Sequence, residues 1–208
     1  DYNFGKFQIV PMPGTTIRHA ATIRHDDDVL PHQPGEFSVC SFNLHGMGTG
    51  DDQYPIPGEY EVQLRKRASV IAAPLQGCTI VALQETGQPE DAAALARLLA
   101  DEFGLRYTAT ALPGPQSSVS QFPLTNGLLT RDDQVTVIAA HSPQGCSPVN
   151  YDVFDAPGAC PAGQYGLFDR PPLVADLQVR GLWGEPIGLR VINNHWKSKS
   201  GDELANAR

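Results

Sequence analysis

Several features that define other classes of protein are missing from this sequence. Charged residues make up only 18% of the chain and hydrophobic residues 41%, a balance that excludes a disordered chain or a coiled coil. No run of about 18 apolar residues occurs, so no spanning helix is expected. The four cysteines form no Cys-x-x-Cys pair, which argues against a zinc site. The remaining class is one compact domain, because 208 residues can bury a sizeable core.

Glycine and proline, by contrast, are abundant. The 20 glycines and 18 prolines favour many strands and turns over a helical bundle. The chain has 15 Lys and Arg against 23 Asp and Glu, a net charge of −8, which argues against holding nucleic acid by bulk positive charge. This balance still permits an enzyme that meets phosphate through a bound metal ion. Since the chain begins at Asp1 without a signal-peptide pattern, we expect a processed product or part of a longer protein.

The cysteines fall into two pairs. Cys146 and Cys160 flank a Pro/Gly-rich loop, where a disulfide would close a loop of about 15 residues and contribute roughly 3 kcal/mol in the chain-entropy model. Cys40 and Cys78 lie in apolar, strand-like segments and are either paired or two buried thiols. An even count with one loop-flanking pair favours an oxidising location, extracellular or periplasmic.

The first 35 residues differ from the rest. The segment 1–10 reads as one strand, and the following stretch is rich in proline with an acidic run at 26–28. We interpret residues 1–35 as a lead-in arm or the tail of a preceding domain. An extra edge strand on the main domain is the alternative. The main domain is expected over residues 36–208.

Within the main domain, apolar residues alternate or recur at helical spacing. Two long loops are expected, over 113–124 and 142–169, and a new helix is expected from about residue 200. The order of elements indicates an α/β or α+β layered domain with helices on one face of a sheet. The expected strands are 37–42, 79–83, 105–112, 125–130, 134–140, 172–179 and 187–194, and the expected helices are 59–75 and 89–103.

Polar residues follow three of these strands. Asn43, Glu85 and the run Asn193-Asn194-His195 each come at a strand end, where open α/β sheets place their sites. Amide and carboxylate oxygens suit Mg²⁺, Mn²⁺ or Ca²⁺, and an imidazole with nearby lysines can stabilise phosphoryl charge. Taken singly, a strand-end Asn is more often a turn former, and a strand-end Glu more often solvated. The combination favours a functional site.

Five short motifs then appear in a fixed order. They are Phe37-Ser-Val-Cys-Ser-Phe-Asn43, Ile80-Val-Ala-Leu-Gln-Glu85, Thr125-Asn-Gly-Leu-Leu-Thr-Arg131, Arg170-Pro-Pro-Leu-Val-Ala175 and Val191-Ile-Asn-Asn-His-Trp-Lys-Ser-Lys199. Through them, residues 36–200 resemble the endonuclease/exonuclease/phosphatase superfamily, which includes pancreatic-type deoxyribonucleases, inositol phosphatases and bacterial sphingomyelinases. The last two motifs look most like the secreted bacterial nuclease branch. The resemblance implies a deoxyribonuclease-like β-sandwich flanked by helices.

The resemblance also implies catalytic and metal-binding roles by matched position. Glu85 would be the principal ligand of a divalent metal, with Mg²⁺ the first expectation and Mn²⁺ or Ca²⁺ the alternatives. Asn43 would bind or orient the metal and the phosphate. His195, with Asn194 beside it, would be catalytic and would stabilise the pentacovalent transition state.

Further matched positions would bind the substrate. Asn126 and Arg170 would hold the phosphate or line the cleft, and Lys197 and Lys199 would contact the nucleic-acid backbone as point charges. Arg131 would line the cleft or brace the fold.

The chain departs from the family in one respect. The family's later Gly-Asp-Phe-Asn-type motif and its terminal Asp-His pair do not occur in residues 1–208. We therefore expect residues 36–208 to be only the N-terminal part of the catalytic domain, with the second half of the sandwich absent. The chain alone would be inactive or unstable, and the remaining C-terminal half would be its partner.

The function expected from this resemblance is that of a secreted, divalent-metal-dependent endonuclease. It would hydrolyse DNA, with RNA as a further candidate, by in-line attack of water on a phosphodiester. Two alternatives remain. One is a sphingomyelinase-like enzyme or another phosphoesterase of the same fold, and the other is a non-catalytic binding domain.

Overall fold

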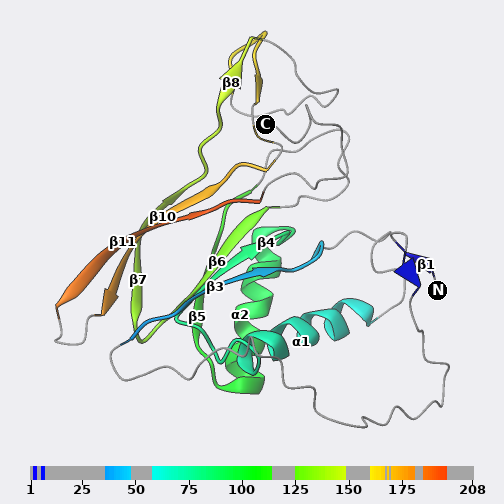
Figure 1. The fold of residues 1–208 in the computed structure, drawn as a ribbon, viewed down its shortest axis with the longest axis vertical. Coiled ribbons are helices and arrows are strands. Elements are labelled where there is room, and N and C mark those ends of the chain that lie inside the picture. Colours follow the sequence, from blue (N-terminus) through cyan, green and yellow to red (C-terminus); the bar gives the residue numbers. More distant parts are fainter. Residues whose placement is uncertain are drawn as a thin grey trace.

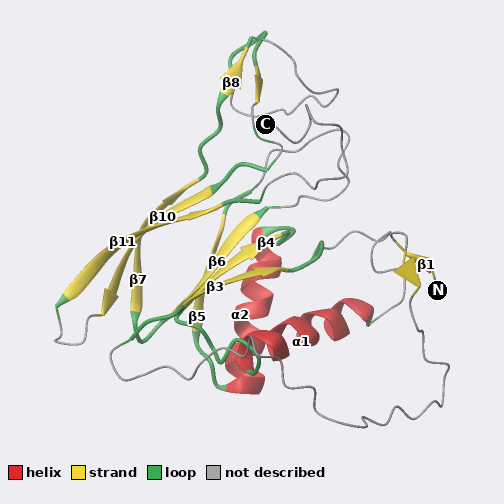
Figure 2. Cartoon of the chain, viewed as in Figure 1, coloured by secondary structure: helices red, strands yellow, loops and turns green. Residues whose placement is uncertain are grey.

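The computed structural model describes residues 2–3, 6–7, 36–47, 58–113, 125–148, 160–166, 168, 170–180 and 185–195. Over this part of the chain, two β-sheets face each other, and two helices cover the outer face of one of them (Figures 1 and 2). The expected mixed α/β fold with a layered sandwich is therefore confirmed.

The first sheet has four strands in the order β3-β4-β6-β5. Strands β3 (Val39–Asn43) and β4 (Ile80–Gln84) are parallel, and β6 (Asn126–Arg131) runs antiparallel to both β4 and β5 (Tyr107–Ala111). All five residues of β4 are buried, as the unbroken apolar run of this central strand requires.

Two helices pack on one face of this sheet (Figure 1). Helix α2 (Pro89–Phe103) starts with proline in its first turn and a capping box between Gln88 and Asp91, and it ends at Gly104 with φ 66°, which are the expected start and stop signals. The side chains of this core come from both helices and from the sheet face beneath them. Among them are Leu64, Ile71, Val81, Leu83, Leu95, Leu99 and Leu129.

Helix α1 (Glu59–Ala72) is shorter than expected. The apolar periodicity predicted a helix through Leu75, but Pro74 lacks an N–H and disfavours helical backbone at the residue before it. The chain instead closes a compact turn, in which the Gly77 N–H donates to the Ile71 carbonyl at 2.8 Å.

The second sheet has three antiparallel strands in the order β11-β10-β7. They are β7 (Val135–His141), β10 (Leu173–Arg180) and β11 (Pro186–Asn193). An apolar layer fills the space between the sheets, with Ile80 and Leu128 from the first and Leu177 and Val179 from the second. Strands that the sequence predicts individually thus pair into a second sheet, as the expected sandwich requires.

Two short hairpins lie outside the sandwich. Strands β1 (Tyr2–Asn3) and β2 (Lys6–Phe7) pair antiparallel, so the interpretation of this segment as one strand is wrong. Strands β8 (Cys146–Ser147) and β9 (Tyr165–Gly166) pair within the expected long loop. The proline-rich remainder of the first 35 residues and the helix expected from residue 200 lie outside the described residues.

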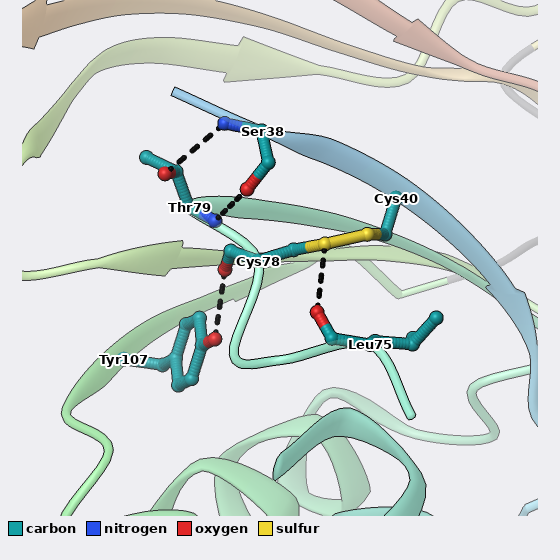
Figure 3. Close-up of a disulfide and its surroundings, with 6 residues drawn as sticks. All are labelled: Ser38, Cys40, Leu75, Cys78, Thr79 and Tyr107. Carbon is teal, nitrogen blue, oxygen red and sulfur yellow. Dashed lines mark hydrogen bonds between the residues drawn. A yellow bond between two sulfur atoms is a disulfide. The ribbon is translucent and has the colours of Figure 1, made fainter. Parts of the chain in front are cut away.

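Two disulfides cross-link the chain. The predicted Cys146–Cys160 bridge is confirmed, with 5.7 Å between its Cα atoms. Cys40 and Cys78 are also paired, with 6.1 Å between their Cα atoms, which decides between the two alternatives left open by the sequence. This second bridge joins the starts of β3 and β4 (Figure 3). No helix in the described part of the chain is long and apolar enough to cross a membrane.

Candidate functional site

The two ends of the sandwich carry different groups of side chains. We call one of them the site end, where β3, β4 and β11 finish at Asn43, Gln84 and Asn193. The opposite one is the far end, where β4 begins and where a turn over residues 132–134 carries the chain from β6 to β7. Because β3 and β4 are parallel, the residues that come after them emerge side by side at the site end.

Four side chains converge at the site end. The Asn43 Nδ2 lies 3.2 Å from the Glu85 Oε1 and 3.4 Å from the His195 Nε2, and the His195 Nε2 lies 3.4 Å from the same Glu85 oxygen. The Arg170 guanidinium also approaches the His195 ring, with Nη1 3.4 Å from Nδ1 and 3.5 Å from Nε2. These distances are longer than those of good hydrogen bonds, as is common in catalytic groups without substrate. The sequence-predicted residues Asn43, Glu85, Arg170 and His195 are therefore brought together. We call them the four-residue cluster.

The backbone beneath this cluster adopts conformations that ordinary residues avoid. His45 has φ 53° and Glu85 has φ 56°, both in the left-handed region where a side chain is strained. The Asn43 Oδ1 accepts from the His45 N–H at 2.7 Å, and the Met47 N–H donates to the Glu85 carbonyl at 3.0 Å. Strain of this kind persists where surrounding contacts impose it, and it gathers at functional sites.

The His195 side chain is 15% exposed and lies between a cation, Arg170, and an anion, Glu85. Burial lowers the pKa of its imidazole, the Arg170 guanidinium lowers it further, and the Glu85 carboxylate raises it. The ring is therefore neutral near pH 7 and carries one N–H donor. A neutral imidazole beside a permanent cation can donate to a phosphate oxygen while the guanidinium supplies the positive charge.

Asn126 does not belong to the four-residue cluster but bonds to the backbone next to Arg170. It is 4% exposed, its Nδ2 donates to the Pro171 carbonyl at 2.9 Å, and its Oδ1 is buried without a partner among the described residues. Its donor thus fixes the backbone next to Arg170. Thr86, directly after Glu85, is fully buried and its hydroxyl also lacks a partner there.

The remaining predicted residues divide into three groups. Asn194 is exposed and lies between the cluster and β11. Lys197 and Lys199 lie outside the described residues. Arg131 lies at the far end, where it pairs with Asp133 at 3.3 Å and stacks over the Tyr107 ring at 5.7 Å, so it braces the fold.

Two residues near the site were not predicted from the sequence, Gln84 and Arg67. Gln84 is buried and is bonded across the two sheets to Asn193, a strand-end residue that the sequence did single out. Arg67 of α1 is 9% exposed and donates to the Leu44 carbonyl at 2.7 Å, beside Asn43. A polar residue inside an apolar strand was the available signal for Gln84, whereas Arg67 looks like any charged helix residue.

Part of the donor set suits a hard divalent ion. Glu85 offers a carboxylate whose side chain is 20% exposed, and Mg²⁺ is commonly held by one or two carboxylates with water and substrate phosphate around it. Asn43 turns its amide nitrogen toward Glu85 and its oxygen toward the His45 N–H, so it orients the carboxylate. Within the described residues, no group of three or more His, Cys, Asp or Glu is arranged to hold a metal. Glu85 thus fits as a ligand and Asn43 as its orienting partner.

Comparison with known proteins gives a likeness in structure alone. No protein-family model matches the sequence, and no curated protein does. The chain is similar to a mannosyl-6-phosphatase of Bacteroides thetaiotaomicron VPI-5482, with a TM-score of 0.42 and 12% identity, over 76% of this chain and 51% of that one. It is also similar to an endonuclease/exonuclease/phosphatase family protein of Bacteroides thetaiotaomicron, with a TM-score of 0.43 and 14% identity, over 78% of this chain and 50% of that one. The chain thus spans about half the length of these two structures.

Proposed function

We propose that this chain carries the catalytic cluster of a divalent-metal-dependent phosphodiesterase that hydrolyses nucleic acid. The observation that carries the proposal is the convergence of Asn43, Glu85, Arg170 and His195, with contacts of 3.2 to 3.5 Å, from four separate segments of the chain. A carboxylate, an amide, an imidazole and a guanidinium form a set suited to phosphoryl transfer. An acidic chain with so few local cations would bind phosphate weakly without further charge.

Each residue of the four-residue cluster has a distinct role in the proposed reaction. Glu85 holds a divalent ion, which when bound offsets negative charge on the phosphoryl oxygens. Asn43 orients that carboxylate through its Nδ2. His195 donates its N–H to an oxygen of the scissile phosphate, and Arg170 supplies a fixed positive charge beside the ring. Water attacks the phosphorus in line with the leaving oxygen.

The substrate and the cellular location are proposed from the sequence and the disulfides rather than from the cluster itself. DNA is the first substrate, with RNA second, because Lys197 and Lys199 follow His195 in the sequence and match backbone contacts in the resembling nucleases. We propose secretion, extracellular or periplasmic, because two disulfides favour an oxidising compartment.

The test is a cleavage assay on the full natural polypeptide that contains residues 1–208. Supercoiled plasmid is incubated with Mg²⁺, with and without EDTA, and the Glu85→Gln variant is compared with Glu102→Gln. Glu102 lies on α2 and pairs with Arg65 at 2.7 Å, at the surface. We expect Glu85→Gln to lower the rate about a thousandfold, equal to about 4 kcal/mol, and Glu102→Gln and the wild type to cleave alike.

Sphingomyelin vesicles and sugar phosphates are assayed in parallel. Hydrolysis of one of these by the wild type, with plasmid left intact, would assign the cluster to another phosphoesterase and overturn the nucleic-acid substrate. Full plasmid cleavage by Glu85→Gln, or cleavage that EDTA leaves unchanged, would overturn the metal-dependent chemistry. Absence of hydrolysis with every substrate would favour a binding domain.

A further inference from the structure

A network of polar side chains lies between the sheets directly behind the four-residue cluster. Its members are Ser41 on β3, Gln84 on β4 and Asn193 on β11. Ser41 precedes Asn43 by two residues, Gln84 precedes Glu85 by one, and Asn193 precedes His195 by two. Each strand that delivers a cluster residue thus also delivers a member of this network.

Asn193 is the centre of the network. It belongs to the second sheet and is 3% exposed, yet its Nδ2 donates to two carbonyls of the first sheet, those of Leu83 at 2.7 Å and Gly127 at 2.8 Å. Its Oδ1 accepts from the Gln84 Nε2 at 2.6 Å. Both amide hydrogens and the amide oxygen are therefore used, and all three bonds cross from one sheet to the other.

Gln84 passes the connection on to β3. It is 7% exposed, and its Oε1 accepts from the Ser41 hydroxyl at 3.2 Å. The Nε2 that donates to Asn193 also lies 3.3 Å from the Ala82 carbonyl. These contacts join the ends of β3, β4 and β11 by directional hydrogen bonds.

A polar network at this position needs a reason beyond stability. A buried pair of amides is stabilising only when every group is bonded, and an apolar pair of similar volume would fill the space between the sheets as well. The apolar layer next to it is non-directional, so it tolerates small shifts of β11 along β4. The ladder with β10 sets the register of β11 within its own sheet, but it does not fix where the end of β11 lies over the first sheet. Directional amide bonds to the Leu83 and Gly127 carbonyls fix that position.

We propose that Asn193 and Gln84 are positioning residues that fix the end of β11 against the end of β4 and thereby hold His195 beside Glu85 and Asn43. The inference rests on the proposed function where it concerns catalysis, but the placement of the His195 ring is a structural claim that stands apart from it. Neither amide touches the reacting atoms; each acts through the residue that comes after it.

The experiment compares Asn193→Leu with Thr79→Val in the full natural polypeptide. Thr79 is a control because it is 1% exposed and, just before β4 at the far end, its hydroxyl donates to the Oε1 of Gln134, in the turn before β7, at 3.2 Å. Both variants remove hydrogen bonds of a buried side chain and put an apolar side chain in its place. Thermal unfolding, kcat and KM with Mg²⁺, and the NMR signal of the His195 Cε1–Hε1 group at one fixed pH are measured. That signal is assigned by its loss in His195→Gln.

We expect both variants to unfold at lower temperature, but only Asn193→Leu to change the site. Its kcat should fall about a hundredfold, since a misplacement of about 1 Å can cost that much, with KM little changed. Its His195 signal should shift or split, whereas Thr79→Val keeps the wild-type signal and kcat. Gln84→Leu should lower kcat on its own yet add little to Asn193→Leu, because the two act as one unit.

Three results would overturn the proposal. These are an unchanged His195 signal in Asn193→Leu, an equal change in Thr79→Val, or full additivity of the Gln84 and Asn193 effects. Where Asn193→Leu fails to fold, Gln84→Met replaces it, because this change keeps the side-chain length and removes the bonds to Ser41 and Asn193 together with the contact to the Ala82 carbonyl. If no variant and no wild-type protein hydrolyses a phosphodiester, the proposed function fails, while the NMR comparison still decides the positioning of His195.

Discussion

Polar side chains bridge neighbouring segments at both ends of the sandwich. At the far end they brace the structure, and at the site end they form the candidate functional site. At the far end, Ser38 and Thr79 exchange backbone-to-hydroxyl bonds of 3.2 and 3.0 Å (Figure 3), and Thr79 reaches across to Gln134. The Cys40–Cys78 disulfide lies beside them. At the site end, the four-residue cluster is held by longer contacts, and Glu85 has a left-handed backbone conformation. At the far end the polar groups are satisfied by bonds to one another, whereas at the site end the cluster side chains are only loosely bonded.

The distribution of unpaired groups supports the same contrast. Among the described residues, two buried side-chain polar atoms have no partner, Thr86 Oγ1 and Asn126 Oδ1, and both lie at the site end. Orphaned buried polar atoms and strained backbone cost free energy. The site end is therefore stabilised by packing and cross-links elsewhere in the sandwich. Mutations at the far end should change stability without changing chemistry, whereas mutations at the site end should change the chemistry.

The largest stability effect should come from removing the far-end disulfide. The Cys40→Ala/Cys78→Ala variant releases a loop with a sequence separation of 38, which costs about 4 kcal/mol of unfolding free energy in the chain-entropy model. Urea unfolding of the full natural polypeptide measures the loss. Plasmid cleavage under conditions where the variant is fully folded should match the wild type. A loss of cleavage in the folded variant would contradict the separation of the two ends.

A second prediction concerns Tyr107, which packs against the far end. Its hydroxyl donates to the Cys78 carbonyl at 2.7 Å (Figure 3), and burial raises the pKa of this phenol to about 12, against the opposing charge of Arg131. Because the folded-state pKa lies above the ordinary value of 10.0, this contribution to stability is complete below about pH 10 and is lost as the pH rises to about 12. The loss amounts to about 3 kcal/mol.

The alkaline loss is measured by urea unfolding at pH 9 and pH 11.5 in the wild type and in Tyr107→Phe. The phenylalanine variant is less stable at pH 9, because the Cys78 carbonyl loses its donor, but its stability should fall less on going to the higher pH. Other groups titrate in both proteins, so the difference between the two falls isolates Tyr107. Equal falls would show that the phenol ionises without cost to the fold.

The sequence predicted the elements of this molecule better than their assembly. Strand β4 and helix α2 were recognisable because a buried apolar run and a capped, periodic helix are local signals. A sandwich was expected from the resemblance, but the strand partners within its second sheet were not, because the pairing of β7 with β10 joins residues far apart in the chain. Pro74 is the local signal that ends α1, and a prediction from apolar periodicity alone does not include it.

The candidate site likewise combines features that the sequence predicted with features that it did not. Asn43, Glu85 and His195 were predictable because each stands at a strand end, where a polar residue is conspicuous. Asn193 was conspicuous for the same reason, but neither its burial nor its pairing with Gln84 was predictable, because the sequence does not say whether a polar residue in a strand faces water or another sheet. Only the packing of β11 on β4 shows that these two amides meet.

The smallest effect is predicted for a substitution of Arg67, which contacts the site end. Arg67 of α1 is 9% exposed, and its Nε donates to the Leu44 carbonyl at 2.7 Å while its Nη2 lies 3.4 Å from the His45 carbonyl. It thereby holds the segment after Asn43, whose Oδ1 accepts from the His45 N–H. Arg67→Met keeps the apolar stem and removes these bonds. We expect unfolding free energy to fall by about 1–2 kcal/mol and kcat by about tenfold, or about 1.4 kcal/mol.

The matched control for this prediction is Arg65→Met on the same helix. Arg65 is exposed and pairs with Glu102 at 2.7 Å, and a surface ion pair of this kind contributes little to stability. Its removal should leave kcat unchanged. If both variants lowered kcat equally, the effect would come from α1 as a whole. If Arg67→Met alone lowers it, the backbone strain at His45 is maintained by a helix on the opposite face of the sheet. The site end would then depend on both layers that enclose the first sheet, Asn193 from one side and Arg67 from the other.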